Sequence, residues 1–263
     1  MPAPHNPLKA QLAAKQLTFG CWLGFGDAHA ADVATTADFD WFVIDNEHAP
    51  NDLRSTLAQL RVVQASSAQA IVRLPIGETW MIKQYLDLGV QNLLIPMVES
   101  AEQAASLVQA MRYPPEGVRG VGAALARASR YSGIPDYLHT ANAELCLIVQ
   151  VESRAGIAAL DEILAVDGVD GVFIGPSDLS ADMGFAGQLD APPVRETIDK
   201  ALAKIHASDK AAGLIALDLD YAAHCAKQGA RFIATAIDIT LFANTLRKAA
   251  AESQTIKQAF SGG

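Results

Sequence analysis

Residues 145–178 read LCLIVQVESRAGIAALDEILAVDGVDGVFIGPSD, and this stretch contains one complete strand–helix–strand unit. An apolar run at 145–151 is followed by a segment of helical period and then by a second apolar run at 169–174. Both runs are nearly continuous in hydrophobic residues, which is typical of parallel strands that are covered by helices. The stretch therefore predicts two parallel strands joined by a helix.

The same alternation extends over the rest of the chain. Further short runs rich in β-branched or aromatic residues occur at 18–25, 41–45, 70–74, 91–97, 213–217 and 231–236. Helical segments separate them, and some begin at a capping residue such as Asn51 or end on Gly, as 79–89 does. Eight strands that alternate with helices predict a single-domain (β/α)8 TIM barrel over residues 1–263. A doubly wound sheet is the alternative, but no GxGxxG turn follows any strand.

Three segments fall outside the repeating pattern. Residues 1–16 are Pro-rich at their start and predict an N-terminal extension or helix with a frayed end. Residues 113–140 are rich in Gly and Pro and predict a long loop that covers the site or a neighbouring subunit. Residues 241–260 predict one amphipathic helix.

Composition excludes several classes of protein. Of 263 residues, 51% are hydrophobic and 19% are charged, which is enough for a large core. The net charge is −9 and no Lys/Arg block occurs, so we expect no nucleic-acid partner. No apolar run approaches the roughly 20 residues of a membrane span, and no targeting pattern opens the sequence. Cys21, Cys146 and Cys225 lack CxxC spacing, so we expect no disulfides. Cys21 and Cys146 lie in apolar strand-like runs, which favours structural burial over catalysis. We expect a cytoplasmic protein without membrane partners.

Polar residues gather at the predicted carboxyl ends of the strands, where barrels of this kind build their active sites. They are Asp45, Glu47 and His48 after strand two, Arg73 in strand three, Asp87 in the next helix, Gln150 and Glu152 at strand five, and Gly175, Pro176, Ser177 and Asp178 after strand six. Because neighbouring strand ends converge, these residues form the candidate site.

Glu152 and Asp178 follow adjacent strands, so their carboxylates can converge on one ion. Oxygen ligands with open positions suit Mg2+ or Mn2+. The alternative is that the two acids cap helices or pair with arginines. The turn at Gly175 to Ser177 offers backbone N–H groups that could receive a substrate carboxylate, and Gln150 could donate to the same group.

Arg73 lies inside an apolar strand, where a charge is costly without a partner. It is either half of a buried ion pair or a receptor for a carboxylate or an enolate. His48 follows Asp45 by three residues, and a carboxylate that orients an imidazole makes it a general base near neutral pH. The alternative for His48 is a structural or surface role.

Six motifs in this order resemble the HpcH/HpaI aldolase family over about residues 18–240. They are IDNEHAPND (44–52), AIVRLP (70–75), LIPMVESAEQA (94–104), RYPPEGVRGVG (112–122), VQVESRAGI (149–157) and FIGPSDLSADMG (173–184). The family comprises class II aldolases, which include 4-hydroxy-2-oxoheptanedioate and 2-dehydro-3-deoxyglucarate aldolases. The resemblance implies reversible addition of a 2-keto acid enolate, from pyruvate or hydroxypyruvate, to an aldehyde, giving a 4-hydroxy-2-keto acid.

The resemblance also implies roles for individual residues. Glu152 and Asp178 match the ligands of a divalent cation, which would be Mg2+, Mn2+ or Co2+. Arg73 matches the arginine that binds the keto acid, and His48 matches the base, with Asp45 as its orienting partner. Gln150, Gly175, Ser177 and Asp178 match groups around the substrate carboxylate, and Asp87 matches an acid near the site. The resemblance further implies a homo-oligomer, a hexamer built as a trimer of dimers, with the last helix on a neighbouring subunit.

The sequence departs from the family pattern at Asn46 and in the segments ALDLD (216–220) and IATAIDIT (233–240), which leaves the acceptor aldehyde open. Rival functions have less support. A Schiff-base aldolase needs a lysine on a strand, and all nine lysines fall in the N-terminal tail or in helical segments. A phosphosugar isomerase needs a Gly-rich phosphate loop after strands seven and eight, and the segments ALDLDY (216–221) and ATAIDIT (234–240) supply none. A CoA-thioester lyase, of the malyl- or citryl-CoA type, and a non-catalytic binding protein are the remaining alternatives.

Overall fold

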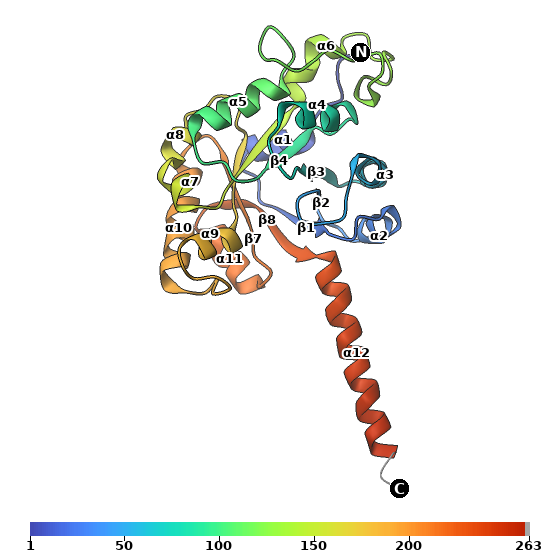
Figure 1. Ribbon diagram of the computed structural model, residues 1–263, viewed down its shortest axis with the longest axis vertical. Helices are drawn as coiled ribbons and strands as arrows, with labels where there is room; N and C mark the ends of the chain where they lie inside the picture. The colour runs from blue at the N-terminus through green and yellow to red at the C-terminus, as the bar shows by residue number, and fades with distance from the viewer. Residues whose placement is uncertain (261–263) are drawn as a thin grey trace.

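The computed structural model describes residues 1–260, in which eight parallel strands close into a barrel in chain order, β1 pairing with β8 (Figure 1). This confirms the predicted (β/α)8 barrel. The strands are β1 (Thr18–Leu23), β2 (Trp41–Asp45), β3 (Gln69–Arg73), β4 (Asn92–Ile95), β5 (Cys146–Val151), β6 (Gly171–Ile174), β7 (Ala211–Ile215) and β8 (Ala230–Ile237). β4 is shorter than the expected run because Pro96 has no N–H to donate and Met97 adopts a left-handed φ of 54°.

Helices form the outer layer. They are α2 (Ala28–Ala34), α3 (Leu53–Val63), α4 (Thr79–Asp87), α5 (Ala101–Met111), α7 (Arg154–Ala158), α8 (Leu160–Leu164), α9 (Pro176–Asp182), α10 (Pro192–Ala207) and α11 (Leu219–Lys227). The segment between β5 and β6, expected as one helix, is two short helices, because Ala159 leaves helical geometry with ψ near 2°. Asp52, Ser100 and Asp218 cap α3, α5 and α11 through their side chains.

The barrel interior is filled by large side chains opposite glycines. A Cβ on Gly20 would overlap the ring of Trp41, and a Cβ on Gly213 would overlap the ring of Phe232. α1 (Pro7–Ala13) closes the amino-terminal end of the barrel with Leu8 and Leu12, which are fully buried. The Pro-rich start before this helix is packed as well, because Ala3 and Asn6 are buried and the Ala3 N–H donates to Thr140 Oγ1 at 2.8 Å, which differs from the frayed end expected there.

The segment from 113 to 140 joins α5 to β5 and contains η1 (Arg127–Ser129) and α6 (Tyr137–Thr140), with η2 (Ala141–Glu144) following. α5 returns the chain to the end of the barrel at which the strands begin, and β5 starts from that same end. The segment between them therefore lies at the amino-terminal ends of the strands (Figure 1). It does not cover the mouth of its own barrel.

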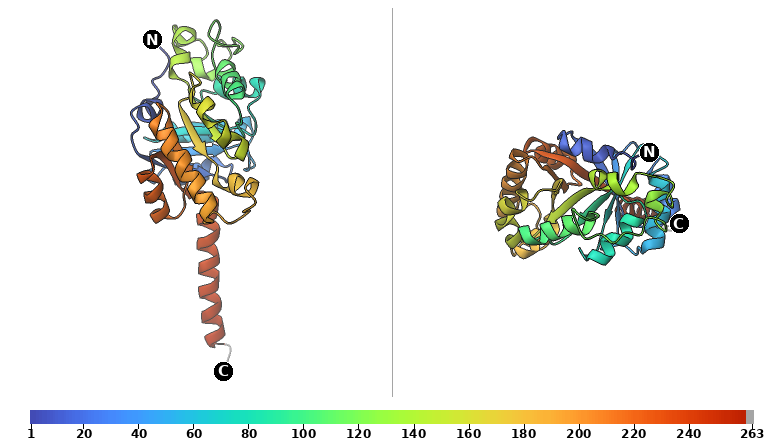
Figure 2. Two further views of the ribbon diagram at one scale, coloured as in Figure 1. Left: turned by 90° about the vertical axis from the view of Figure 1, so that its left-hand side faces the viewer. Right: turned by 90° about the horizontal axis from the view of Figure 1, so that it is seen from above.

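α12 (Asp238–Phe260) leaves the barrel after β8 and projects away from it (Figure 1, Figure 2). It begins three residues before the predicted start, and it has no buried residues. No helix within residues 1–260 combines the length and the apolar character that a membrane crossing requires.

Candidate active site

A cavity of about 540 Å³ opens at the carboxyl ends of the strands. Of the predicted site residues, it brings together Asp45, His48, Arg73, Gln150, Gly175, Ser177 and Asp178. Glu152 lies behind this wall with 2% of its surface exposed. Parallel strands that end at one edge of the barrel thus gather residues from across the sequence, as their strand positions indicated.

Arg73 is held by two acids. It ends β3 in register with Asp45 of β2, and its Nε and Nη2 donate to Asp45 Oδ1 and Oδ2 at 2.9 and 2.7 Å. Its Nη1 lies 2.8 Å from Glu47 Oε2, and its guanidinium stacks over the Trp22 ring, 5.1 Å from the centroid. Burial alone would raise the pKa of Asp45, but the hydrogen bonds and charge of Arg73 outweigh it and lower that pKa. Asp45 is therefore ionised and Arg73 is fixed.

This geometry corrects the expected pairing of Asp45 with the His48 imidazole. Both oxygens of Asp45 are taken by Arg73, and Asp45 meets His48 only through the backbone N–H, at 3.5 Å. The imidazole Nε2 instead faces Glu47 Oε2 at 3.7 Å, and the side chain is 67% exposed. The carboxylate beside His48 is therefore Glu47.

Glu47 is a site residue to which the sequence pattern assigned no role. Burial raises its pKa, while the positive charge of Arg73 works against that rise. Its position between Arg73 and His48 comes from the turn after β2, in which Asp45 Oδ1 accepts the Glu47 N–H at 3.0 Å. The signal available in the sequence was the alternation of Asp45 and Glu47 at a strand end.

Glu152 follows β5 and is fixed by neighbours on both oxygens. Its Oε1 accepts the Met97 N–H at 2.8 Å, and its Oε2 accepts from the Gln150 amide. Burial raises the pKa of Glu152, and the negative charge of Asp178 adds to that rise. A Cβ at Gly175 would overlap the Glu152 carboxylate, so glycine is required there.

A divalent cation fits this donor set. Two carboxylates approach closely enough for the charge of Asp178 to act on Glu152, and Gln150 Oε1 beside them is buried without a hydrogen-bond partner. Within the described part of the chain, no three His, Cys, Asp or Glu side chains converge as a metal site. Two carboxylates would leave the other positions of a cation to substrate and water, as Mg2+ commonly requires.

The start of α9 contributes backbone donors. Pro176 opens this helix, so the N–H groups of Ser177 and Asp178 lie in its first turn, where no helical carbonyl faces them. Gly175 contributes space rather than a donor, because its own N–H is bonded to the Val151 carbonyl at 3.1 Å.

Asp87 does not line this cavity. It ends α4 at the opposite end of the barrel, where it pairs with the buried Arg119 at 2.7 Å. Its predicted catalytic role stays a prediction that the geometry of one chain does not support.

The sequence pattern also missed the apolar wall of the cavity. Trp22, Phe173, Ile215 and Ile237 come from the strands, and Pro50 and Ile239 come from the segments that follow them. Only their positions in the sequence could have identified them, because each residue lies in or just after a strand that carries a site residue or is adjacent to such a strand.

The closed barrel gathers the arginine held by two acids and the carboxylates of Glu152 and Asp178 at its mouth, which is where TIM-barrel enzymes build their sites. The chain belongs to the HpcH/HpaI aldolase/citrate lyase family, whose sequence model matches residues 18–245. It is 58% identical over 255 residues to the hydroxypyruvate/pyruvate aldolase of Roseovarius nubinhibens, covering 97% of this chain and 99% of that one.

Two further relatives agree. The 4-hydroxy-2-oxo-heptane-1,7-dioate aldolase of Salmonella dublin is 48% identical over 238 residues, or 90% of each chain. The crystal structure of a HpcH/HpaI aldolase/citrate lyase family protein from Burkholderia cenocepacia superposes with a TM-score of 0.90 at 36% identity, over 95% of this chain and 99% of that one. The chain is accordingly an enzyme of the carbon–carbon lyase class.

Proposed function

We propose that this enzyme adds the enolate of pyruvate or hydroxypyruvate to an aldehyde and cleaves the resulting 4-hydroxy-2-keto acid in reverse. The observation that carries the proposal is the Arg73 guanidinium, fixed by Asp45 and Glu47 beside the Glu152 and Asp178 carboxylates. An anion receptor next to a cation site suits a substrate whose carboxylate and keto oxygens both need stabilisation. The relatives named for this reaction support the same assignment.

Glu152 and Asp178 are proposed to hold the divalent cation, with Mg2+, Mn2+ and Co2+ as the candidates. When bound, the cation would polarise the keto carbonyl and make the C3 protons more acidic. Glu152 suits this role because Met97 and Gln150 orient its carboxylate. Asp178 suits it because it lines the same cavity from the first turn of α9.

The remaining residues are proposed to bind the keto acid and to move its proton. Gln150 and the backbone N–H groups of Ser177 and Asp178 receive the substrate carboxylate. His48 Nε2 takes a proton from C3, and Arg73 stabilises the oxyanion that forms. His48 is exposed at the cavity, with Glu47 3.7 Å away to balance the positive charge that the imidazole gains when it takes the proton. The apolar wall that includes Trp22 and Ile237 is left to contact the aldehyde.

Neither rival lyase mechanism gains support from the cavity. None of the residues that line it is a lysine, so a Schiff-base nucleophile is not in place. A CoA-thioester lyase is not favoured, because relatives at 58% and 48% identity are named for aldolase reactions.

We also propose that the chain forms a homo-oligomer, with a hexamer as the expected size. Phe242, Leu246, Ile256 and Phe260 recur along α12 at helical spacing and are 53% to 86% exposed. A second copy of the chain would cover this face. Sedimentation velocity of the wild type and of Leu246→Glu tests the proposal, and a monomeric wild type would contradict it.

The proposed reaction is tested by incubating pyruvate or hydroxypyruvate with glycolaldehyde, with Mg2+ or Mn2+ and then with excess EDTA. We expect a 4-hydroxy-2-keto acid by NMR only when the cation is present. Product formation that is unchanged in EDTA would remove the cation from the proposal, and absence of product from a panel of aldehydes would remove the aldol reaction.

A further inference from the structure

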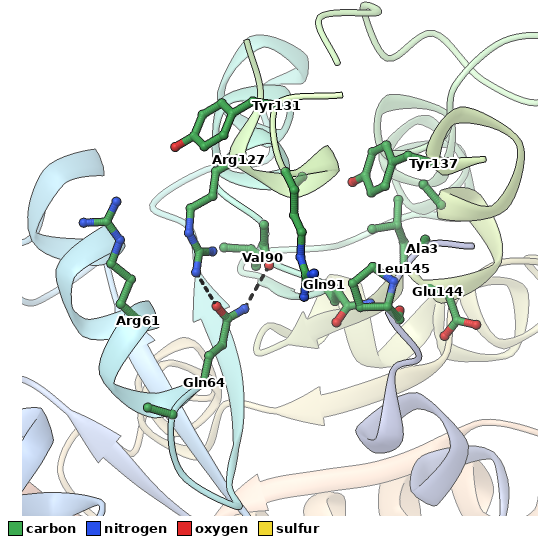
Figure 3. Close-up of a pocket in the computed structure, with 16 residues that line it drawn as sticks. Ala3, Arg61, Gln64, Val90, Gln91, Arg127, Tyr131, Tyr137, Glu144 and Leu145 are labelled. Atoms are coloured by element: carbon green, nitrogen blue, oxygen red, sulfur yellow. Dashed lines mark hydrogen bonds between the residues drawn. The ribbon is translucent and has the colours of Figure 1, made fainter. Parts of the chain in front are cut away.

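A second cavity, of about 690 Å³, lies at the opposite end of the barrel from the active site. It is open to solvent and is bordered by the last turn of α3, the residues that precede β4 and the segment around η1 (Figure 3). We name it the arginine pocket after Arg61, Arg127 and Arg130, which line it together with Gln64 and Tyr131. Its volume falls within the roughly 300–1,000 Å³ that is usual for sites that bind small molecules.

Among the residues that the structure describes, no acidic side chain pairs with the three arginines of this pocket. Arg127 donates from Nη1 to the Leu88 carbonyl and from Nη2 to Gln64 Oε1, both at 2.9 Å. Within residues 1–260, the ion pairs found for this protein include none with Arg61, Arg127 or Arg130. Arg61 and Arg130 are exposed and Arg127 is half-buried, so the pocket and its rim carry positive charge that no acid among the described residues offsets, in a chain whose net charge is −9.

The acid that lines the pocket, Glu144, is occupied elsewhere. It accepts the Asn6 N–H at 2.7 Å and faces His5 Nδ1 at 3.3 Å. Figure 3 shows Glu144 on the far side of the pocket from Arg61 and Arg127. Burial lowers the pKa of Arg127, and the positive charge of Arg61 lowers it further, because the two cations repel each other without a counter-charge between them.

The backbone that presents Arg130 is strained. Arg130, Tyr131 and Ser132 have φ angles of 53°, 56° and 68°, a run of three left-handed residues without a glycine. L-residues enter this region at a cost and normally one at a time. Ser129 holds the run in place, because its Oγ accepts the Ser132 N–H at 3.0 Å and donates to the Ala123 carbonyl. Such strain is concentrated at functional sites, where it fixes a side chain in position.

We propose that the arginine pocket binds a small multivalent anion that carries carboxylate or phosphate groups. Arg61 and Arg127 supply guanidinium donors from neighbouring elements, and Arg130 supplies a third from the strained turn. Planar guanidinium groups pair with either kind of anion through two parallel hydrogen bonds. The site is separate from the cavity that holds Arg73, and its existence does not depend on the aldolase reaction.

The proposal is tested by calorimetric titration of the full-length, metal-free protein with pyrophosphate and with citrate, at constant ionic strength set by chloride. We expect at least one of them to bind with sub-millimolar affinity, and the two arms distinguish a phosphate ligand from a carboxylate ligand. Arg61→Gln and Arg130→Gln should each weaken binding about tenfold or more. Arg54→Gln is the matched control, because Arg54 is exposed on the same helix as Arg61 but does not line the arginine pocket, and this variant should bind as the wild type does.

A further titration uses Arg73→Lys, and unchanged binding there supports a site apart from the active site. Four results would overturn the proposal. The first is that neither anion binds, and the second is that Arg61→Gln and Arg130→Gln bind as tightly as the wild type. The third is that Arg73→Lys loses binding. The fourth is that the oligomeric state of the wild type does not change with either anion, whereas Arg61→Gln dissociates. The last result would make the pocket an interface between copies of the chain.

Discussion

Arg73 and Asp45 face each other across neighbouring strands and are joined by two parallel hydrogen bonds of 2.9 and 2.7 Å. The register of β2 and β3 sets this pair, so the barrel itself orients the guanidinium. A guanidinium that is fixed before substrate arrives needs no rearrangement when negative charge develops on the substrate.

Replacing Arg73 by Lys should therefore reduce catalysis although the positive charge is kept. A lysine cannot reproduce the paired hydrogen bonds or the stacking on Trp22. We expect kcat/KM to fall by about 10²- to 10³-fold, or about 2.7–4 kcal/mol. Steady-state kinetics of the aldol reaction measures this, with Arg54→Lys on the exposed face of α3 as the control. Turnover near that of the wild type would show that the planar arrangement of donors in the guanidinium is not used in catalysis.

Replacing Asp45 by Asn should destabilise the fold. The change keeps the shape of the side chain but removes one charge from a buried ion pair, a loss that typically costs about 3–5 kcal/mol. Glu47 still pairs with Arg73, so we expect the lower end of that range. Urea unfolding at pH 7 measures the change. Asp161→Asn, whose pair with Lys204 is exposed, should shift stability by about 0.5 kcal/mol or less.

Replacing Gly175 by Ala should weaken cation binding. The added methyl group would overlap the Glu152 carboxylate and lie about 3.1 Å from the Gln150 amide nitrogen, so one of them has to move. We expect Mn2+ affinity to fall by about 10- to 100-fold, the loss usual when a ligand is no longer oriented. Titration with Mn2+ followed by electron paramagnetic resonance measures it. Gly122→Ala, where only Asp87 is within 4 Å, should bind Mn2+ normally.

Stability should also depend on His206 in mildly acidic solution. Burial lowers the pKa of His206 below its ordinary value of about 6.5, and the charges of Arg231 and Lys15 lower it further. The unfolded chain therefore binds a proton that the folded chain resists, so stability is full above about pH 6.5 and declines as pH falls toward the folded pKa. Thermal unfolding at pH 7.5 and pH 5.5 should show a larger drop for the wild type than for His206→Gln. Equal drops would contradict a role for His206.

The barrel could be predicted from the sequence because its strands are buried on both sides and therefore appear as continuous apolar runs. The set of polar residues at the strand ends followed from the same logic, since parallel strands end together. The sequence left two roles open for Arg73, and the structure shows its ion pair with Asp45 and its place in the lining of the cavity.

The sequence could not show which of several nearby side chains a polar residue pairs with. Asp45 is three residues from His48 in the chain but lies directly across the sheet from Arg73, and the cross-strand pair takes both of its oxygens. Asp87 follows the strand that carries Arg73, yet one helix returns it to the far end of the barrel. The arginine pocket was equally hidden, because Arg61, Arg127 and Arg130 come from separate elements whose approach is decided only by packing.

The most direct measurement of the central claim is deuterium exchange at C3 of pyruvate in D2O, followed by NMR, because it detects the enolate without any aldehyde. The account predicts exchange with Mg2+ or Mn2+ that is lost in EDTA, in Glu152→Gln and in His48→Ala. Exchange that persists in EDTA or in Glu152→Gln would contradict the cation site. Absence of exchange from the cation-loaded wild type, with hydroxypyruvate as well as pyruvate, would contradict enolate formation itself.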